Sequence, residues 1–231
     1  MSISSDDSIV QNQPKTKYPT KIDRVTAALN LPKVASYNLR SLGPKVQSLK
    51  TDLIERSIEL AFLQEIWEPK ENRAFHFEIE KMFEMHGLQY VSKPRPPNAK
   101  GRSYGGVAIV VNNQKFSCER LNILTPKNIE VVWGLLKPKN LSPSLFKKII
   151  VCSFYSPPSK GKHSKLADHI VTTLHMLMSK YPGSGIILGA DKNSMDITPI
   201  LSCGLKLHQI VDKNTRKDKV LDIIIMNTSG Y

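Results

Sequence analysis

Several apolar segments of this 231-residue chain end in side chains that could hold a metal ion or contact a phosphate. Asn38, Glu65 and Asp191 each close or follow such a segment, and Asn193 lies two positions after Asp191. Oxygen ligands suit hard cations such as Mg²⁺, and such a cation neutralises the charge that develops when a phosphodiester is cleaved. Side chains two positions apart in an extended segment point to the same side, so we expect Asp191 and Asn193 to face one site.

Each of these residues also has an ordinary structural explanation. An Asn at the end of a strand is commonly a turn residue, as Asn38 would be, and Asp191 with Asn193 would form an Asx turn. An isolated Glu is usually solvated, and Tyr155 would be a core tyrosine. The order of the segments along the chain favours the chemical interpretation.

Six short segments occur in an order and at a spacing that is more informative than any one of them. The segments are Tyr37-Asn38-Leu39-Arg40-Ser41-Leu42, Leu63-Gln64-Glu65-Ile66-Trp67, Gly105-Gly106-Val107-Ala108-Ile109, Ser153-Phe154-Tyr155-Ser156-Pro157-Pro158, Leu188-Gly189-Ala190-Asp191-Lys192-Asn193, and Thr215-Arg216 before Leu221-Asp222. The series resembles the endonuclease/exonuclease/phosphatase superfamily. Within it, the series is most similar to the apurinic/apyrimidinic-type endonuclease domain of non-LTR retrotransposons. The resemblance covers about residues 33 to 226.

The resemblance implies both a fold and an activity. The fold is a four-layer α/β sandwich, in which two packed mixed sheets are flanked by helices and the active site lies at one end of the sheets. The activity is Mg²⁺-dependent nicking of duplex DNA, with Mn²⁺ as an alternative cation, which leaves a 3′-hydroxyl to prime reverse transcription. Glu65 would be the metal ligand, and Asn38 would place that carboxylate or the water on the metal.

The other matched residues would act on the phosphate and the attacking water. In the superfamily, the positions of Asp191 and Asn193 orient or activate the water and bind the phosphate. Tyr155, which matches a Tyr-x-Pro pattern, would place its hydroxyl on the scissile phosphate. Asp222 matches a carboxylate that orients a catalytic histidine.

The sequence departs from the superfamily pattern at two places. The superfamily closes with Ser-Asp-His, whose His contacts the scissile phosphate, and no such segment follows Asp222 before Tyr231. We therefore expect a domain that is truncated before its last strand. Lys192 stands where an aromatic or aliphatic residue is usual.

These departures keep two further hypotheses open. One is a truncated nucleic-acid-binding remnant without catalysis, because loss of one catalytic group commonly costs orders of magnitude in rate. The other keeps the fold and the metal but changes the substrate to a phospholipid or an inositol phosphate, which the lysine-rich stretches would also suit.

The charge of the chain favours a polyanionic partner. Its formal net charge is +13, and such an excess makes contact with a phosphate backbone favourable and salt-dependent. Residues 93–102 and 131–167 contain no acidic side chain. The side chains that we expect to contact duplex DNA are Lys93, Arg95, Lys100, Arg102, Lys160, Lys162 and Arg216.

The composition excludes several other classes of protein. The longest apolar runs are shorter than the roughly 20 residues of a membrane helix, and the polar N-terminus lacks the apolar part of a signal peptide. Three widely spaced cysteines argue against a disulfide framework and against a paired-cysteine zinc site. We expect an intracellular protein, and a nuclear one if it is functional.

Alternating strand and helix patterns along the chain would position the candidate site residues. Buried strands are predicted where the apolar residues run without interruption, and helices where they recur with a period near 3.6. Three strand patterns without a helix between them predict an antiparallel meander at 116–124, 129–136 and 148–155. Residues 1–30 lack an apolar period and are expected to be a flexible polar leader, whereas 31–231 are expected to form one domain.

Overall fold

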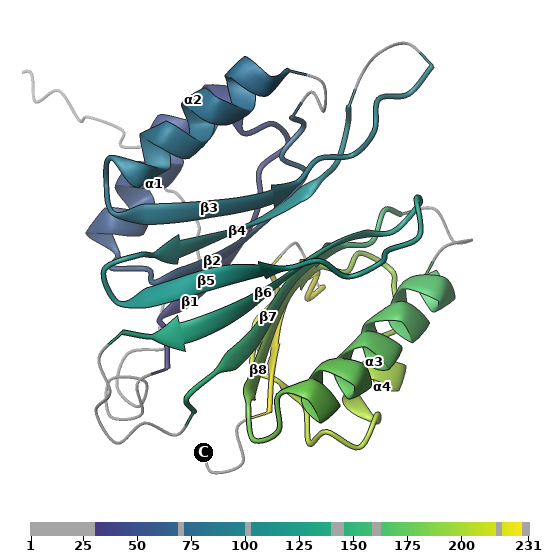
Figure 1. Cartoon of the computed structure of the whole chain (residues 1–231). Helices are drawn as coiled ribbons and strands as arrows, with labels where there is room; N and C mark the ends of the chain where they lie inside the picture. Colours follow the sequence, from purple (N-terminus) through teal and green to yellow (C-terminus); the bar gives the residue numbers. More distant parts are fainter. Residues whose placement is uncertain are drawn as a thin grey trace, which may run out of the picture.

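The computed structural model describes residues 31–68, 72–99, 103–139, 146–158, 163–215 and 219–227. Two mixed sheets pack face to face, and helices cover the outer face of each (Figure 1). This arrangement confirms the four-layer α/β sandwich predicted from the sequence. The expected leader at 1–30 lies outside the described residues.

The first sheet contains four strands in the order β1-β2-β4-β3. β1 and β2 are parallel, because helix α1 connects them as a crossover. β4 is antiparallel to both of its neighbours. The bounds are β1 (Val34–Asn38), α1 (Val46–Glu55), β2 (Leu60–Gln64), β3 (Leu88–Lys93) and β4 (Val107–Asn112).

The second sheet contains six strands in the order β5-β6-β7-β8-β10-β9. The predicted meander forms β5, β6 and β7, and helix α3 then makes β7 and β8 parallel. The bounds are β5 (Phe116–Leu121), β6 (Glu130–Pro138), β7 (Ile149–Tyr155), α3 (His163–Lys180), β8 (Gly185–Asp191), β9 (His208–Gln209) and β10 (Asp222–Met226).

Three apolar layers hold the sandwich together. One layer lies between the first sheet and helices α1 and α2 (Arg73–Glu84), and another lies between the second sheet and helices α3 and α4 (Thr198–Leu201). The third layer fills the space between the sheets. A short 3₁₀ helix, η2 (Gly43–Lys45), leads into α1. Among the described residues, no helix combines the length and the apolar character needed to cross a membrane.

Two predicted strands differ from the observed ones at a boundary, and one predicted helix face differs at a single residue. The strand expected at 116–124 ends at Leu121. The run at 104–111 predicts a strand by its apolar residues, but β4 begins only at Val107, because Gly105 and Gly106 adopt positive φ angles of 120° and 86°. In α1, the spacing of Val46, Leu49, Leu53 and Ile54 predicts one apolar face; the first three side chains are buried, but Ile54 is 50% exposed. The core strands β2, β7 and β8 are buried along their whole length, as their apolar sequences predict.

Gly189 allows the two sheets to approach closely beneath the strand ends. A Cβ atom at this position would lie 2.0 Å from Cδ2 of Phe62, which is fully buried. We expect Gly189→Ala to lower the free energy of unfolding by about 1–3 kcal/mol, because the core cannot accommodate an added methyl group without strain. Urea unfolding followed by circular dichroism measures this change.

Gly43→Ala is the matched control for this substitution. Its added Cβ would meet Phe75 at 3.5 Å, an ordinary van der Waals distance, and its φ angle is not positive. We expect a change within about 0.5 kcal/mol. Equal costs at the two positions would contradict the close packing at Gly189.

Candidate active site

Strands of both sheets end or begin at one edge of the sandwich and bring the predicted polar residues together. In the second sheet, Tyr155 pairs with Asp191, which pairs with Asp222 on β10. Paired residues on neighbouring strands project from the same face of a sheet. Asn38, at the end of β1 in the first sheet, contacts this face through its side chain. Residues far apart in the sequence therefore meet in one place.

Asn38 joins the two carboxylates at the centre of this site. Its Nδ2 donates hydrogen bonds of 2.7 Å to Oε1 of Glu65 and to Oδ2 of Asp191. The hydroxyl of Tyr155 donates to the same Oε1 of Glu65 at 3.0 Å. Two carboxylates thus converge on a single nitrogen, and each sheet supplies one of them.

A turn with left-handed backbone presents Glu65. The residue follows the last position of β2 and has a φ angle of 52°, a conformation that is unfavourable for a residue with a Cβ atom. Two backbone hydrogen bonds hold this turn. The N–H of Ser41 donates to the carbonyl of Glu65 at 2.8 Å, and the N–H of Trp67 donates to the carbonyl of Gly105 at 2.8 Å. Non-glycine residues keep such strain mainly where the surroundings enforce it and where a side chain must be aimed.

The glycine pair Gly105-Gly106 also makes room for an ion pair behind the site. Oε2 of Glu130 accepts a hydrogen bond from Gly106 N–H, and Oε1 pairs with the guanidinium of Arg95. A Cβ at Gly105 would lie 2.6 Å from both Arg95 Nε and Glu130 Oε2. Glycine is therefore required for this close approach of backbone and side chains.

The surroundings of the site keep Tyr155 neutral and Arg95 positively charged beside the carboxylates. Burial raises the pKa of Tyr155 well above its usual range, and the neighbouring charge of Glu65 raises it further. The phenol therefore remains protonated and available to donate. Burial lowers the pKa of Arg95, while Tyr155 and Glu65 act in the opposite direction. An arginine remains cationic under such conditions.

The segment after β8 is a turn and not the extended chain that the spacing predicted. Asn193 has a φ angle of 46°, and its N–H donates to Oδ1 of Asp191 at 3.1 Å, which is the Asx turn considered above. The amide Nδ2 of Asn193 donates to the carbonyl of Ser156 at 2.8 Å. Asp191 is nonetheless at the site through its second oxygen. The same carboxylate thus both shapes the turn and faces Asn38.

Thr215 fixes the chain before β10. Its Oγ1 accepts hydrogen bonds from the backbone N–H groups of Leu221 and Asp222 at 3.0 and 3.1 Å. This contact explains the Thr of the Thr-Arg segment as a positioning residue for Asp222. Arg216 lies outside the described residues.

A buried polar network connects the two sheets directly beneath the site. Gln64 is fully buried; its Oε1 accepts from Ser36 at 3.3 Å and its Nε2 donates to Oγ of Ser153 at 3.4 Å. Oγ of Ser153 in turn donates to the carbonyl of Leu63. The residue before Glu65 is thereby attached to the opposite sheet, which limits how far the two halves of the site can separate.

The chemistry of these groups fits a hard divalent cation. Within the described residues, no group of three or more His, Cys, Asp or Glu side chains is arranged to hold a metal. Proteins commonly hold Mg²⁺ with one or two carboxylates, while water and substrate phosphate complete its coordination. Oδ1 of Asn38 is buried and has no hydrogen-bond partner among the described residues. An unpaired buried oxygen beside two carboxylates is a suitable environment for such an ion.

The predicted DNA-contacting side chains are only partly described. Lys93 and Arg95 lie at and just beyond the end of β3, and Arg95 is beside the carboxylate site. Lys100, Arg102, Lys160 and Lys162 lie outside the described residues.

Solved structures of other proteins share this architecture. No protein-family model matches the chain, and no curated protein matches it by sequence. The catalytic domain of human Nocturnin, with bound sulfate, superposes with a TM-score of 0.64 at 13% identity, covering 86% of this chain and 83% of that one. The endonuclease domain of TRAS1, a telomere-specific non-LTR retrotransposon, gives 0.55 at 18% identity, with 84% of each chain covered.

A third similar structure carries a family description. It is an endonuclease/exonuclease/phosphatase family protein from Bacteroides thetaiotaomicron, with a TM-score of 0.58 and 15% identity over 84% of this chain and 80% of that one. The chain has the endonuclease/exonuclease/phosphatase fold. Identities this low establish the architecture. The residues at the strand ends must therefore carry any argument about chemistry.

Proposed function

We propose that this chain is a Mg²⁺-dependent phosphodiesterase that nicks duplex DNA. The observation that carries the proposal is the convergence of Glu65 and Asp191 on the amide of Asn38. Tyr155 and Arg95 add a neutral donor and a cation to the same place. The excess of 13 positive charges on the chain and the similar fold of the TRAS1 endonuclease domain favour DNA as the substrate.

Each side chain has a distinct task in this proposal. Glu65, with the free oxygen of Asn38, would hold Mg²⁺, which when bound neutralises charge on the phosphoryl oxygens. Asp191, on the other side of Asn38, would accept the proton of the attacking water. The Tyr155 hydroxyl and the Arg95 guanidinium would donate hydrogen bonds to the phosphate, where negative charge accumulates as the bond breaks. Asn193 would hold the turn that carries Asp191.

Plasmid nicking tests the proposal directly. With the purified chain and Mg²⁺, supercoiled plasmid should become nicked circle. Excess EDTA should abolish this conversion, and added Mg²⁺ should restore it. The nicks should support extension by a DNA polymerase without prior treatment of the ends, because the proposed cleavage leaves a 3′-hydroxyl.

Two other results would replace the proposal with a different function. Release of phosphate from phosphoinositides or inositol phosphates, with plasmid left intact, would assign the same site to a smaller phosphoester. DNA binding that weakens with salt, without any Mg²⁺-dependent nicking, would indicate a binding protein that does not catalyse cleavage.

A further inference from the structure

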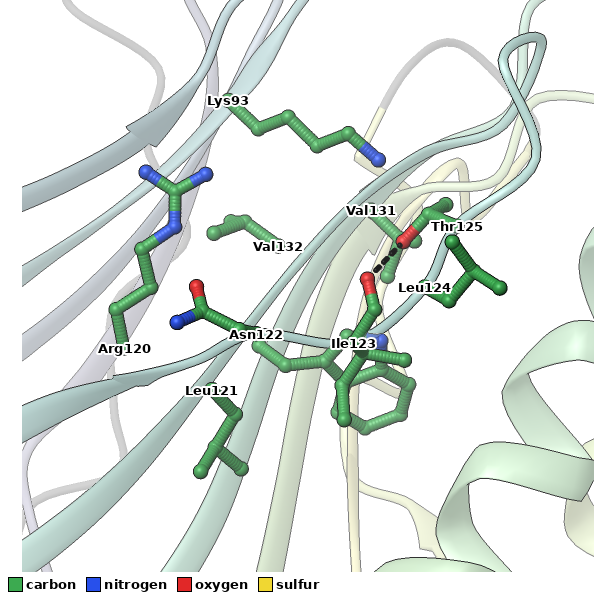
Figure 2. Close-up of a pocket in the computed structure, with 10 residues that line it drawn as sticks. Lys93, Arg120, Leu121, Asn122, Ile123, Leu124, Thr125, Val131 and Val132 are labelled. Carbon is green, nitrogen blue, oxygen red and sulfur yellow. Dashed lines mark hydrogen bonds between the residues drawn. The ribbon is translucent and has the colours of Figure 1, made fainter.

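A cavity of about 420 Å³ opens between the edges of the two sheets and shares no lining residue with the carboxylate site (Figure 2). Its walls come from the end of β3, from the end of β5 with the segment that follows, and from β6. β5 stops pairing at Leu121, so the first part of β6 borders the cavity without a neighbouring strand on that side. The cavity thus lies where β5 ends earlier than its sequence pattern predicts.

Two cationic side chains line this cavity, one from each sheet. Lys93 ends β3 and Arg120 lies near the end of β5, and Figure 2 shows both side chains around Val132. None of the lining residues that the structure describes is acidic. Over the described part of the chain, neither cation is paired with a carboxylate; the Lys93 ammonium donates to the carbonyl of Ile129 at 3.4 Å. Positive charge is therefore concentrated here without a carboxylate partner from the described residues.

Partial burial makes this charge energetically unfavourable when the cavity holds no anion. Burial, and to a smaller extent repulsion from Arg120, lowers the pKa of Lys93 to about 8. An anion between the two side chains would offset both effects, because opposite charge favours the protonated lysine. The planar guanidinium of Arg120 can donate two parallel hydrogen bonds to the oxygens of a phosphate.

The remaining walls combine polar groups with an apolar surface. Nε1 of Trp133, a residue that is only 1% exposed, has no hydrogen-bond partner among the described residues. Asn122 and Thr125 add polar groups, and Ile123 and Leu124 add aliphatic surface, with Leu124 96% exposed. This combination places apolar surface beside the two cations, which suits a phosphate group and any skeleton that carries it.

We propose that this cavity is a second anion-binding site, which takes a phosphate group at a place separate from the site of cleavage. The phosphate would come from a nucleic-acid strand or from a free phosphate compound, and both present the same chemistry to Lys93 and Arg120. The proposal goes beyond the function proposed above and does not depend on it, because binding here needs neither Glu65 nor a metal.

Tryptophan fluorescence provides a local measurement of binding. The chain has two tryptophans, so Trp67→Phe leaves Trp133, at the cavity, as the single reporter. In the presence of EDTA, this protein is titrated with inorganic phosphate and, separately, with a short DNA duplex. We expect a saturable change in Trp133 emission. Lys93→Met and Arg120→Gln should each weaken the apparent affinity at least tenfold, with circular dichroism confirming that each variant is folded.

Lys127→Met is the matched control for general electrostatic attraction. Lys127 is exposed in the segment after β5 but does not line the cavity, and its substitution removes the same charge. Its affinity should stay within twofold. A response to the duplex alone would identify a strand as the source of the phosphate, and a response to both would show that the phosphate group suffices.

Either of two results would overturn the proposal: no saturable response to either probe, or equal weakening in Lys127→Met and in the cavity variants. Adding Glu65→Gln to the single-tryptophan protein separates the two sites. Its fluorescence response should be unchanged whether or not the chain nicks DNA, so failure of one proposal leaves the other testable.

Discussion

Glu65→Gln should reduce the rate of Mg²⁺-dependent plasmid nicking by about a thousandfold or more. The substitution keeps the size and shape of the side chain, and its Oε1 can still accept from Asn38 and Tyr155, as the carboxylate does. It removes the negative charge that would hold the cation. Loss of one charged or donor group that acts in the transition state commonly costs two to several orders of magnitude. Single-turnover nicking assays at saturating Mg²⁺ measure the change.

The stability of the same variant separates a chemical role from a structural one. Glu65 and Asp191 share one amide donor, and like charges at such a site repel each other. Removing one charge should therefore leave the melting temperature unchanged or raise it slightly. Glu55→Gln, at an exposed position of α1, should alter neither activity nor stability. Nicking by Glu65→Gln at the rate of the unmodified chain would remove Glu65 from the proposed metal site.

Local patterns in the sequence predict most of this fold and the main candidates for the site. Uninterrupted apolar runs identified the central strands, and Glu65 and Asp191 could be selected because each follows such a run. The strand register then places Tyr155, Asp191 and Asp222 side by side on neighbouring strands. These features depend on short-range periodicity, which the sequence displays directly.

The contacts that support the site depend on residues far apart in the sequence. The sequence does not identify Glu130 as a site residue; its only indication is that it is an acidic residue at the start of a largely apolar strand. Its partner Arg95 was expected to contact DNA, but it also pairs with Glu130. The bond between Gln64 and Ser153 links positions 89 residues apart. Periodicity within one segment contains no information about such partners.

We expect the Arg95–Glu130 ion pair to contribute strongly to stability. Glu130→Leu would leave a half-buried guanidinium without its partner and the N–H of Gly106 without an acceptor. Breaking a buried ion pair on one side typically costs 3–5 kcal/mol. The Arg95 side chain is 34% exposed, so water would compensate part of the loss, and we expect a cost of about 3 kcal/mol. Urea unfolding measures it.

Glu119→Leu is the control, because Glu119 forms an ion pair with Lys137 in which both side chains are about half exposed, at 57% and 46%. Exposed pairs contribute roughly 0–1 kcal/mol, so this variant should unfold near the midpoint of the unmodified chain.

Glu130→Leu should also lower the rate of nicking. The turn that orients Glu65 is hydrogen-bonded to the Gly105-Gly106 segment, and Glu130 accepts a hydrogen bond from that segment. Equal losses of unfolding free energy in the two variants would show that the Arg95–Glu130 pair contributes no more than an exposed pair. The orientation of Glu65 would then depend on the backbone hydrogen bonds alone.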